Sequence, residues 1–528
     1  MHLRHLAHLI GLLAAAGSTC QPSPARAQHP NVRVSNPGST SPEEVTIAVD
    51  PTNPLRLAAG ANIRYFYYSF DGGLGWTEGV LSSSLGVAGD PVVLYDEHGY
   101  LYYGHLSISS TGDWLDRIVV QRSSTGGMAW NDGAGVGLDP PRDQDKPGLA
   151  VDRTGSPYRD RLYLAWTEFD SYGSAQGQDS SRILFSHSVD LGITWSPPVR
   201  VNDVAGDCQD GDNTVEGAVP AVGPQGQVYL AWSGPGGILF DRSLDGGASW
   251  GRDVPVAAQP GGWDFAVSGI SRCNGLPTTL CDSGNSPYRG FIYVVWSDQR
   301  AGADNTDLFL SRSTDGGLTW GPPVRVNDDL TTRHQFFPAA TLDPETGILY
   351  VVYYDRRATT GDDTEIYLAR SADGGQTFHS IRVSDQPFTP DPQVFFGDYI
   401  GVAALGRRIH PIWMRLDAGA LSVWTASLSD SAATVGTPAP ASVTVSLGAF
   451  PNPLRTSTRL SYSLAASGAV SVRVLDVQGR LKAVLADEMQ QAGAHVLEWD
   501  ARAFSPGLYF CTLSAAGTTT RVKLIVIR

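Results

Sequence analysis

The chain is short of charge, of methionine and of long apolar segments. Charged residues make up 17% of its 528 positions, and it contains 4 methionines and 5 cysteines. After its first residues it has no uninterrupted apolar stretch of about 18 residues, so we expect no membrane-spanning helix. Acidic residues outnumber basic ones, 53 to 38. The resulting net charge of −15 argues against a nucleic-acid partner, because phosphates need lysine and arginine.

Glycine and proline, by contrast, are abundant. The chain has 59 glycines and 34 prolines, residues that delimit short strands and form turns. A hydrophobic fraction of 42% suffices for a packed core, and the length exceeds that of one ordinary domain. We therefore expect an all-β protein with more than one domain rather than a helical bundle.

The N-terminal residues predict export. The apolar run Leu9–Ala16 is followed by Ala25-Arg26-Ala27, which fits the small-x-small pattern of a signal-peptide cleavage site. We therefore assign residues 1–27 as a signal peptide. The apolar run is too short to span a bilayer.

Export also determines what the cysteines can do, because oxidising compartments permit disulfide bonds. Cys273 and Cys281 lie in one short insertion rich in glycine, proline and serine. We expect a local disulfide bond between these two. The alternative is that all the thiols are free.

One octapeptide with the consensus Ser-x-Asp-x-Gly-x-Thr-Trp recurs six times, with Thr125 replacing the aspartate in one copy. The carboxylate can accept backbone N–H bonds within a tight turn, and the glycine can adopt the positive φ that such a turn needs. The closing aromatic ring can pack against a sheet. We therefore expect structural roles for the box aspartates, which are Asp71, Asp190, Asp245, Asp315 and Asp373.

Each box belongs to a larger unit of short apolar segments. In one unit, Ile292–Trp296 and Asp307–Arg312 precede the box and Val324–Asn327 follows it. Four antiparallel strands repeated radially form a β-propeller. A seventh unit without a box has three expected strands, and Asn31–Asn36 resembles the missing fourth. We expect seven blades closed by this N-terminal strand, which removes exposed sheet edges; six blades are the alternative.

The octapeptide is similar to the Asp-box, or bacterial neuraminidase repeat (BNR repeat), and residues 31–430 resemble sialidase-like propellers. Sialidases of this kind hold a carboxylate with three arginines and use a tyrosine nucleophile paired with glutamate, together with an aspartate acid/base. Their first arginine lies in an Arg-x-Pro motif. Neither Arg56 nor Arg64 is followed by proline where the first unit begins.

The C-terminal residues 449–528 resemble the sorting domain of the type IX secretion system, a small immunoglobulin-like sandwich. The motifs include Ala449-Phe450-Pro451-Asn452-Pro453 and Gly507-Leu508-Tyr509. The resemblance implies outer-membrane passage, the type IX machinery as a partner, and a secreted or cell-surface location. The expected domains are the signal peptide 1–27, the propeller 28–430, a linker 431–442 rich in alanine, serine, threonine and proline, and the sorting domain 443–528.

The loops of a propeller blade lie on two opposite faces. Because the boxes mark the third turn of each unit, residues before the first strand and after the second should converge on the other face, around the central channel. Polar residues at these positions define a candidate site: Asp90, Asp145, Glu216 and Tyr399 as catalytic candidates, and Lys146, Arg300, Arg356, Arg357 and Asp398 as ligand-binding candidates. Arginines can pair with a ligand carboxylate, and paired carboxylates suit glycoside hydrolysis. The alternative is that these charges pair with one another between blades.

We therefore expect an exported sialidase-like propeller that recognises a glycan, glycoprotein or protein ligand on the face opposite its boxes. The alternative is an exo-α-sialidase-like glycoside hydrolase that uses an arginine cluster and Tyr399 with a carboxylate. The sequence has no zinc motif and no glycine-rich loop that opens a helix. We expect no metal and no cofactor, although the acidic loop around Cys208 leaves calcium open.

Overall fold

The structure is a computed structural model that describes residues 30–108, 114–430, 447–450, 452–464, 468–491, 493–515 and 518–527. The expected signal peptide 1–27 and linker 431–442 lie outside these residues. Within them, no helix has the length and apolarity needed to cross a membrane.

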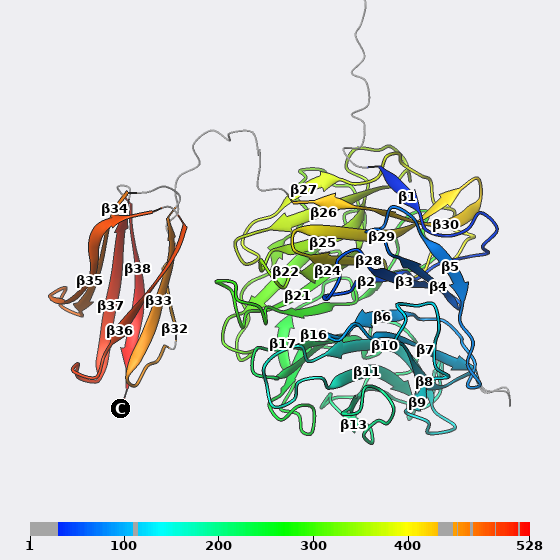
Figure 1. Cartoon of the computed structure of the whole chain (residues 1–528), viewed down its shortest axis with the longest axis horizontal. Coiled ribbons are helices and arrows are strands. Elements are labelled where there is room, and N and C mark those ends of the chain that lie inside the picture. The colour runs from blue at the N-terminus through cyan, green and yellow to red at the C-terminus, as the bar shows by residue number, and fades with distance from the viewer. Residues whose placement is uncertain are drawn as a thin grey trace, which may run out of the picture.

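Residues 30–430 form a ring of antiparallel sheets (Figure 1). Among the described residues there are seven such sheets of four strands, the last with one extra short strand, β31 (Leu428–Ser429). The first strands are β2 (Thr46–Val49), β6 (Val92–Tyr95), β10 (Asp143–Val151), β14 (Glu216–Val222), β20 (Thr278–Cys281), β24 (Gln335–Leu342) and β28 (Gly401–Leu405). Each first strand contacts the first strand of the next sheet, and β28 contacts β2. These contacts close the ring around a central channel, and the predicted β-propeller is confirmed.

The other strands lie successively outward in each sheet. The second strands are β3 (Leu57–Ala61), β7 (Leu101–Ile108), β11 (Leu162–Phe169), β15 (Val228–Gly234), β21 (Ile292–Asp298), β25 (Leu349–Asp355) and β29 (Arg408–Asp417). The third strands are β4 (Tyr65–Ser69), β8 (Trp114–Ser123), β12 (Ser181–Ser188), β16 (Gly237–Ser243), β22 (Asp307–Ser313), β26 (Glu365–Ser371) and β30 (Ala420–Ala426). The fourth strands are β5 (Thr77–Val80), β9 (Ala134–Val136), β13 (Val199–Arg200), β17 (Val254–Ala257), β23 (Val324–Arg325), β27 (His379–Arg382) and β1 (Asn31–Arg33).

The ring is closed by its own N-terminus. Strand β1 pairs with β30, so that Asn31 lies opposite Ala426. The Asn31 side chain also donates a hydrogen bond to the carbonyl of Val383 in the preceding blade, at 3.0 Å. The edge of the last sheet is therefore paired within the chain, as the sequence predicts.

The second strands explain why the sequence forms packed blades. β11, β21 and β25 are buried along their whole length and consist largely of β-branched, aromatic and leucine residues. Such residues favour a pleated surface that is covered on both faces. Each blade therefore packs against both neighbours.

The boxes occupy the turns between the third and fourth strands. In the first box, the Ser69 hydroxyl donates to Asp71 at 2.8 Å and accepts the Gly73 N–H at 3.0 Å. The Asp71 carboxylate also accepts the Gly75 N–H at 3.0 Å. These bonds hold the turn from within, which agrees with the structural role expected for the box aspartates.

The boxes also join neighbouring blades. The Trp250 ring packs edge-on against Phe185 of the preceding blade, with ring centres 4.9 Å apart. Gly247 has φ +91°, and a Cβ atom there would lie 2.2 Å from the Phe185 ring. Arg242 donates to the carbonyl of Gly316 in the following box at 2.6 Å. Box residues thus combine a positive φ with close packing between blades.

The box turns share a face with the turns that end the innermost strands. Gly246 of one box accepts a hydrogen bond at 3.2 Å from Arg161, which ends such a turn. The innermost strands therefore begin on the opposite face, where the sequence analysis places the candidate site.

The predicted disulfide bond is wrong, because Cys273 and Cys281 are both free. Cys273 lies in β19 (Cys273–Asn274), which forms a small hairpin with β18 (Asp264–Phe265). Cys281 ends β20, where it lies opposite Ile292 of its own sheet. The two thiols are thus fixed in different sheets, and their side chains contact different hydrophobic clusters.

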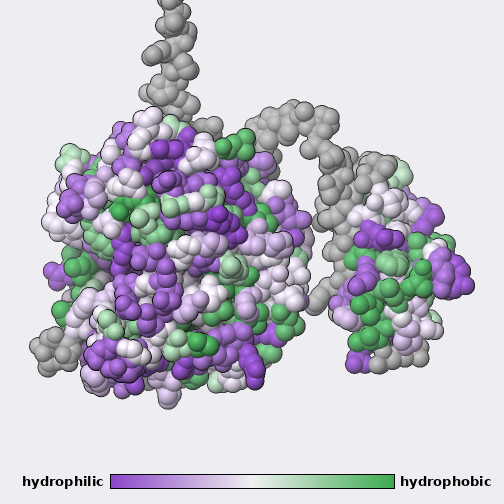
Figure 2. Space-filling model, turned by 180° about the vertical axis from the view of Figure 1, so that it is seen from behind, coloured by the Kyte–Doolittle hydropathy of each residue, from purple (hydrophilic) through white to green (hydrophobic). Residues whose placement is uncertain are grey.

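The C-terminal region forms two further sheets. One contains β32 (Leu447–Phe450), β33 (Ser457–Leu464) and β36 (Gly493–Asp500); the other contains β35 (Leu481–Gln490), β34 (Gly468–Asp476), β37 (Gly507–Ala515) and β38 (Thr518–Val526). Leu460 and Trp499 of the first sheet share a buried cluster with Val472 and Leu513 of the second. The two sheets therefore pack as a sandwich. Hydrophobic residues gather on the visible surface of this region (Figure 2).

Candidate functional site at the channel mouth

Irregular backbone marks the point where several innermost strands begin. Glu44, Asp90 and Lys146 have positive φ values of 54°, 50° and 51°. Strands β10 and β14 also contain register shifts, directly after Asp145 and Glu216 respectively. Such irregularities turn side chains away from the regular pleat and are frequent beside functional sites. Here they bring charged side chains of several blades together at the mouth of the channel.

Lys146 links the carboxylates of three other blades. Its Nζ lies 2.6 Å from Asp398, 3.3 Å from Asp90 and 3.9 Å from Glu44, and its side chain is 12% exposed. Burial opposes the charge of this ammonium group, but the carboxylates of Asp398, Asp90 and Glu44 raise the pKa of Lys146. The side chain is therefore a fixed cation at the mouth.

Arg272 covers the same cluster from the insertion that contains β18 and β19. Its Nε donates to Asp398 at 2.9 Å and its Nη1 to Asp210 at 3.0 Å. The guanidinium carbon lies 5.4 Å from the ring centre of Phe395. On the other side, the Tyr172 hydroxyl donates to Asp210 at 2.6 Å. Through Arg272, the insertion before β20 thus contacts the segment before β14, which contains Asp210, and the segment before β28, which contains Asp398.

The pKa values of the carboxyl groups in this cluster are shifted in different directions. Burial, and then the nearby charge of Asp90, raises the pKa of Asp145 to about 7. Burial, and to a smaller extent the nearby charge of Asp210, raises the pKa of Glu216 well above its usual value. Burial also opposes the charge of Asp398, but Lys146 and Arg272 outweigh it and lower the pKa of Asp398 to about 2. One site therefore contains carboxyl groups whose pKa values are shifted in opposite directions.

Glu216 is distinctive because it lacks hydrogen bonds. The residue is 1% exposed, and neither carboxylate oxygen has a partner in the part of the chain that the structure describes. By comparison, Asp145 accepts the N–H of Lys146 at 2.8 Å. A buried carboxylate without a donor is costly.

Two exposed aromatic rings lie beside the cluster. Trp114 is 52% exposed and packs edge-on against Tyr172, with ring centres 5.9 Å apart. Phe395, beside Arg272, is 40% exposed. A cavity of about 390 Å³ opens on the same face, and its lining includes Asp212 and Trp263. The mouth therefore presents charged groups and exposed aromatic faces, and the cavity lies beside the insertion that carries Arg272.

The three arginines proposed from the sequence do not come together. Arg300 pairs with Asp298 at 2.5 Å, and Arg356 pairs with Asp362 at 3.2 Å. Arg357 lies 2.6 Å from Asp355 and 2.5 Å from Asp328. Each guanidinium thus has its own carboxylate, and the pairs with Asp298, Asp355 and Asp362 are local to one blade rather than between blades.

Tyr399 lies in the same cluster, where it interacts electrostatically with Asp90, Glu44 and Lys146. Its hydroxyl donates to the carbonyl of Pro91 at 3.3 Å. Burial, and then the charge of Asp90, raises its pKa well above the usual value. Asp90, Asp145, Lys146, Glu216 and Asp398 do lie in one electrostatically connected group.

Two residues of the cluster, Glu44 and Arg272, are not predicted from the sequence. Glu44 precedes the first strand of its blade, as Asp90 precedes its own, so aligning the units would have indicated it. Arg272 lies in an insertion outside the repeat, and no motif marks it.

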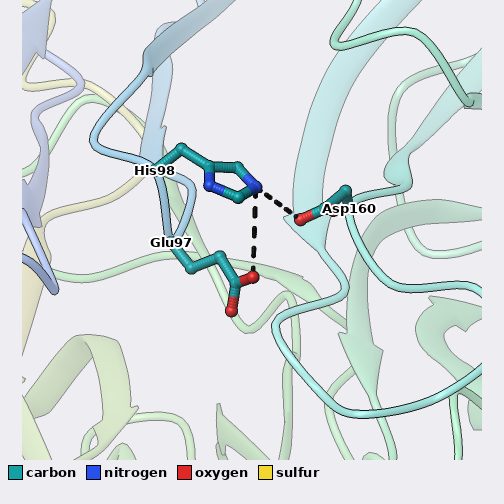
Figure 3. Close-up of side chains that lie close together, drawn as sticks. All are labelled: Glu97, His98 and Asp160. Carbon is teal, nitrogen blue, oxygen red and sulfur yellow. Dashed lines mark hydrogen bonds and ion pairs between the residues drawn. The ribbon is translucent and has the colours of Figure 1, made fainter.

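A separate group of side chains, His98, Glu97 and Asp160, lies in the turns that follow β6 and β10, on the box face; Figure 3 shows how they approach one another. The His98 Nε2 is 3.0 Å from Asp160 and 3.9 Å from Glu97, and Glu97 also binds Arg159. In the described part of the chain, these three side chains are the one group of potential metal ligands that lie within 4.8 Å of one another. Because they are partly exposed and join two adjacent blades, they form a surface ion-pair network.

The C-terminal sandwich matches a known family. Residues 448–527 match the family described as "Secretion system C-terminal sorting domain". The chain is therefore exported, with a secreted or cell-surface location. No curated protein matches the chain.

Solved structures similar to this chain are distant. A PL25 ulvan lyase has 11% identity and a TM-score of 0.45, with 74% of this chain and 96% of that chain covered. An α-L-arabinanase of Penicillium chrysogenum has 16% identity and a TM-score of 0.41, with coverage of 64% and 92%. The NanB sialidase of Streptococcus pneumoniae has 9% identity and a TM-score of 0.40, with coverage of 71% and 83%.

Proposed function

We propose that this exported propeller binds a carbohydrate chain at the channel mouth, on the face opposite its boxes. The observation that carries the proposal is the position of exposed Trp114 and Phe395 beside the ionic cluster of Arg272, Asp398 and Asp210. Aromatic faces can pack against the apolar C–H surface of a sugar ring. Carboxylates accept hydrogen bonds from hydroxyl groups, and guanidinium groups donate to them. Both kinds of group meet at this mouth.

The location of the protein agrees with such a ligand. The sorting domain at residues 448–527 takes the chain out of the cell, where polysaccharides and glycoproteins are accessible. The type IX secretion machinery is the partner proposed for this domain, and a glycan or glycoprotein is the partner proposed for the mouth.

A second candidate function, hydrolysis of a glycosidic bond, is supported by the contrast between Asp145 and Asp398. Glycoside hydrolysis needs one carboxylic acid that gives a proton to the leaving oxygen and one carboxylate that takes a proton from water. Asp145 has a pKa of about 7 and can hold the proton, and Asp398, with its pKa lowered to about 2, is the proposed ionised partner. The separate partners of Arg300, Arg356 and Arg357 do not support the exo-α-sialidase form of this reaction.

The test is binding of the full-length chain to an array of oligosaccharides. We expect the wild type to retain at least one class of glycan, and Trp114→Ala to weaken binding up to about tenfold, because an aromatic stacking contact contributes about 0.5–1.5 kcal/mol. Leu318→Ala is the matched control, since it removes an exposed apolar side chain on the box face. An array without bound glycan, or equal loss in both variants, contradicts the proposal.

Hydrolysis is tested separately with fluorogenic glycosides. Release of the fluorophore by the wild type, and its loss in Asp145→Asn, supports the second candidate. Binding without release identifies the mouth as a recognition site alone.

A further inference from the structure

The mouth contains more acidic groups than its cations neutralise. Its carboxyl groups are Glu44, Asp90, Asp145, Asp210, Glu216 and Asp398, whereas the cations that contact or influence them are Lys146 and Arg272. Both cations already have carboxylate partners within the protein. A ligand carboxylate would therefore have to displace these partners before Lys146 or Arg272 could bind it. This argues against sialic acid and other acidic sugars as ligands.

One of these carboxylates is prepared for a donor that the described protein does not supply. Glu216 is 1% exposed, and neither of its oxygens has a hydrogen-bond partner among the residues that the structure describes. It interacts electrostatically with Asp210, Asp145 and Asp398, so it belongs to the same cluster. A buried carboxylate gains most from a donor that also carries positive charge, because charge-assisted hydrogen bonds are the strong ones.

A series of interactions connects the exposed rim of the mouth with Glu216. Trp114 contacts Tyr172, and the Tyr172 hydroxyl donates to Asp210. Asp210 in turn interacts with Glu216. A sugar ring that packs on Trp114 is thus close to Asp210, the acidic group of the cluster nearest to this rim.

We propose that the mouth selects a sugar with a free ammonium group, a de-N-acetylated amino sugar, whose cation is held by Asp210 and Glu216. This inference rests on the proposed carbohydrate-binding function and names its ligand class. The ammonium group supplies the missing donor to Glu216, and the surrounding carboxylates favour its charge. An N-acetylated sugar lacks that charge, and a carboxylated sugar has the opposite charge.

The experiment compares three ligands by isothermal titration calorimetry with the full-length chain. They are the glucosamine tetrasaccharide, its fully N-acetylated counterpart and sialyllactose, measured at about pH 6, where the amine is protonated. We expect the glucosamine tetrasaccharide to bind at least about tenfold more tightly than the other two, because hydrogen bonds to charged groups contribute about 1.5–3 kcal/mol.

Variants locate the effect. Glu216→Gln should reduce the preference to less than about threefold, whereas Glu345→Gln, an exposed carboxylate on the box face, should leave it unchanged. A thermal melt checks the fold of each variant. If Glu216→Gln does not fold, Asp210→Asn at the rim takes its place, with the same expected loss of preference.

The outcomes separate this inference from the proposed function. Equal or tighter binding of the N-acetylated tetrasaccharide or sialyllactose overturns the amino-sugar assignment but leaves carbohydrate binding intact. A preference that persists in both mouth variants also overturns it. No binding of any array glycan removes the proposed function itself.

Discussion

Aspartate has different roles on the two faces of the propeller. On the box face, Asp315 accepts hydrogen bonds from the N–H and hydroxyl of Thr319, within its own turn, at 3.0 and 2.5 Å. Burial opposes the charge of Asp315, but these bonds outweigh it and lower its pKa. At the mouth, Asp398 instead binds Lys146 and Arg272 from other blades. Short-range contacts make the box aspartates structural parts of each blade, whereas long-range contacts make the mouth a shared site.

The largest effect is expected from removing the cation that joins the blades. Lys146→Met leaves Asp398, Asp90 and Glu44 without their ammonium partner. Breaking a buried ion pair from one side costs about 3–5 kcal/mol, so we expect the free energy of unfolding of the propeller to fall by that amount in urea denaturation. Lys482→Met, which removes a lysine–aspartate pair of the C-terminal sandwich, is the control. Equal stability of Lys146→Met and wild type would contradict the role of Lys146.

A box glycine tests the opposite face. Gly247→Ala adds a Cβ atom 2.2 Å from the Phe185 ring at a φ of +91°. We expect a loss of about 2–3 kcal/mol of unfolding free energy, because overpacking and left-handed backbone strain add together. Gly155→Ala, where no atom lies within 4 Å of the added Cβ, should be nearly neutral. A similar melt for both variants would show that the box does not join the blades.

The protonation of Asp145 predicts an unusual dependence of stability on pH. Its pKa is about 7 in the folded protein against an ordinary value of 3.8. Its contribution to stability is therefore fully present below 3.8 and is lost as the pH rises through about 7. We expect Asp145→Asn to lack this loss and to be more stable than wild type above about pH 7, by about 2 kcal/mol.

Urea denaturation across this range measures the difference. Asp315→Asn is the control, because the pKa of Asp315 is lowered rather than raised. The interpretation fails if Asp145→Asn and wild type show parallel pH profiles.

The smallest effect is expected for a single box aspartate. Asp315→Ala removes the hydrogen bonds of one turn, at a cost of about 1 kcal/mol. Glycan affinity at the mouth should stay within about twofold of wild type, since the turn is on the other face. A larger change in affinity than in the melting temperature would show that the two faces are coupled.

The sequence predicted the features that depend on repetition. The boxes and the strand order recur with each unit, and Asn31–Arg33 completes the last one. Asp90, Lys146 and Asp398 meet because each lies near the start of an innermost strand. A residue's place in the repeat predicts its place in the propeller, because every blade has the same geometry.

The remaining features depend on contacts outside the repeat. Arg272 lies in an insertion outside the repeat, and the spacing of the repeats does not indicate where that insertion runs. The arginine cluster failed to assemble because Arg300 and Arg357 each lie two residues after an aspartate and pair with it locally. The disulfide prediction failed because proximity in sequence does not bring together two cysteines that lie in separate sheets.

The central claim is that the ligand binds at the channel mouth, and the position of a bound oligosaccharide tests it most directly. Hydrogen–deuterium exchange of the full-length chain, with and without the oligosaccharide, measures that position. We expect protection in residues 264–274, 210–216 and 393–399, which surround Arg272, Glu216 and Asp398 at the mouth, and unchanged exchange in the box turns. Protection of the box turns, with the mouth unaffected, would contradict the assignment of the binding face.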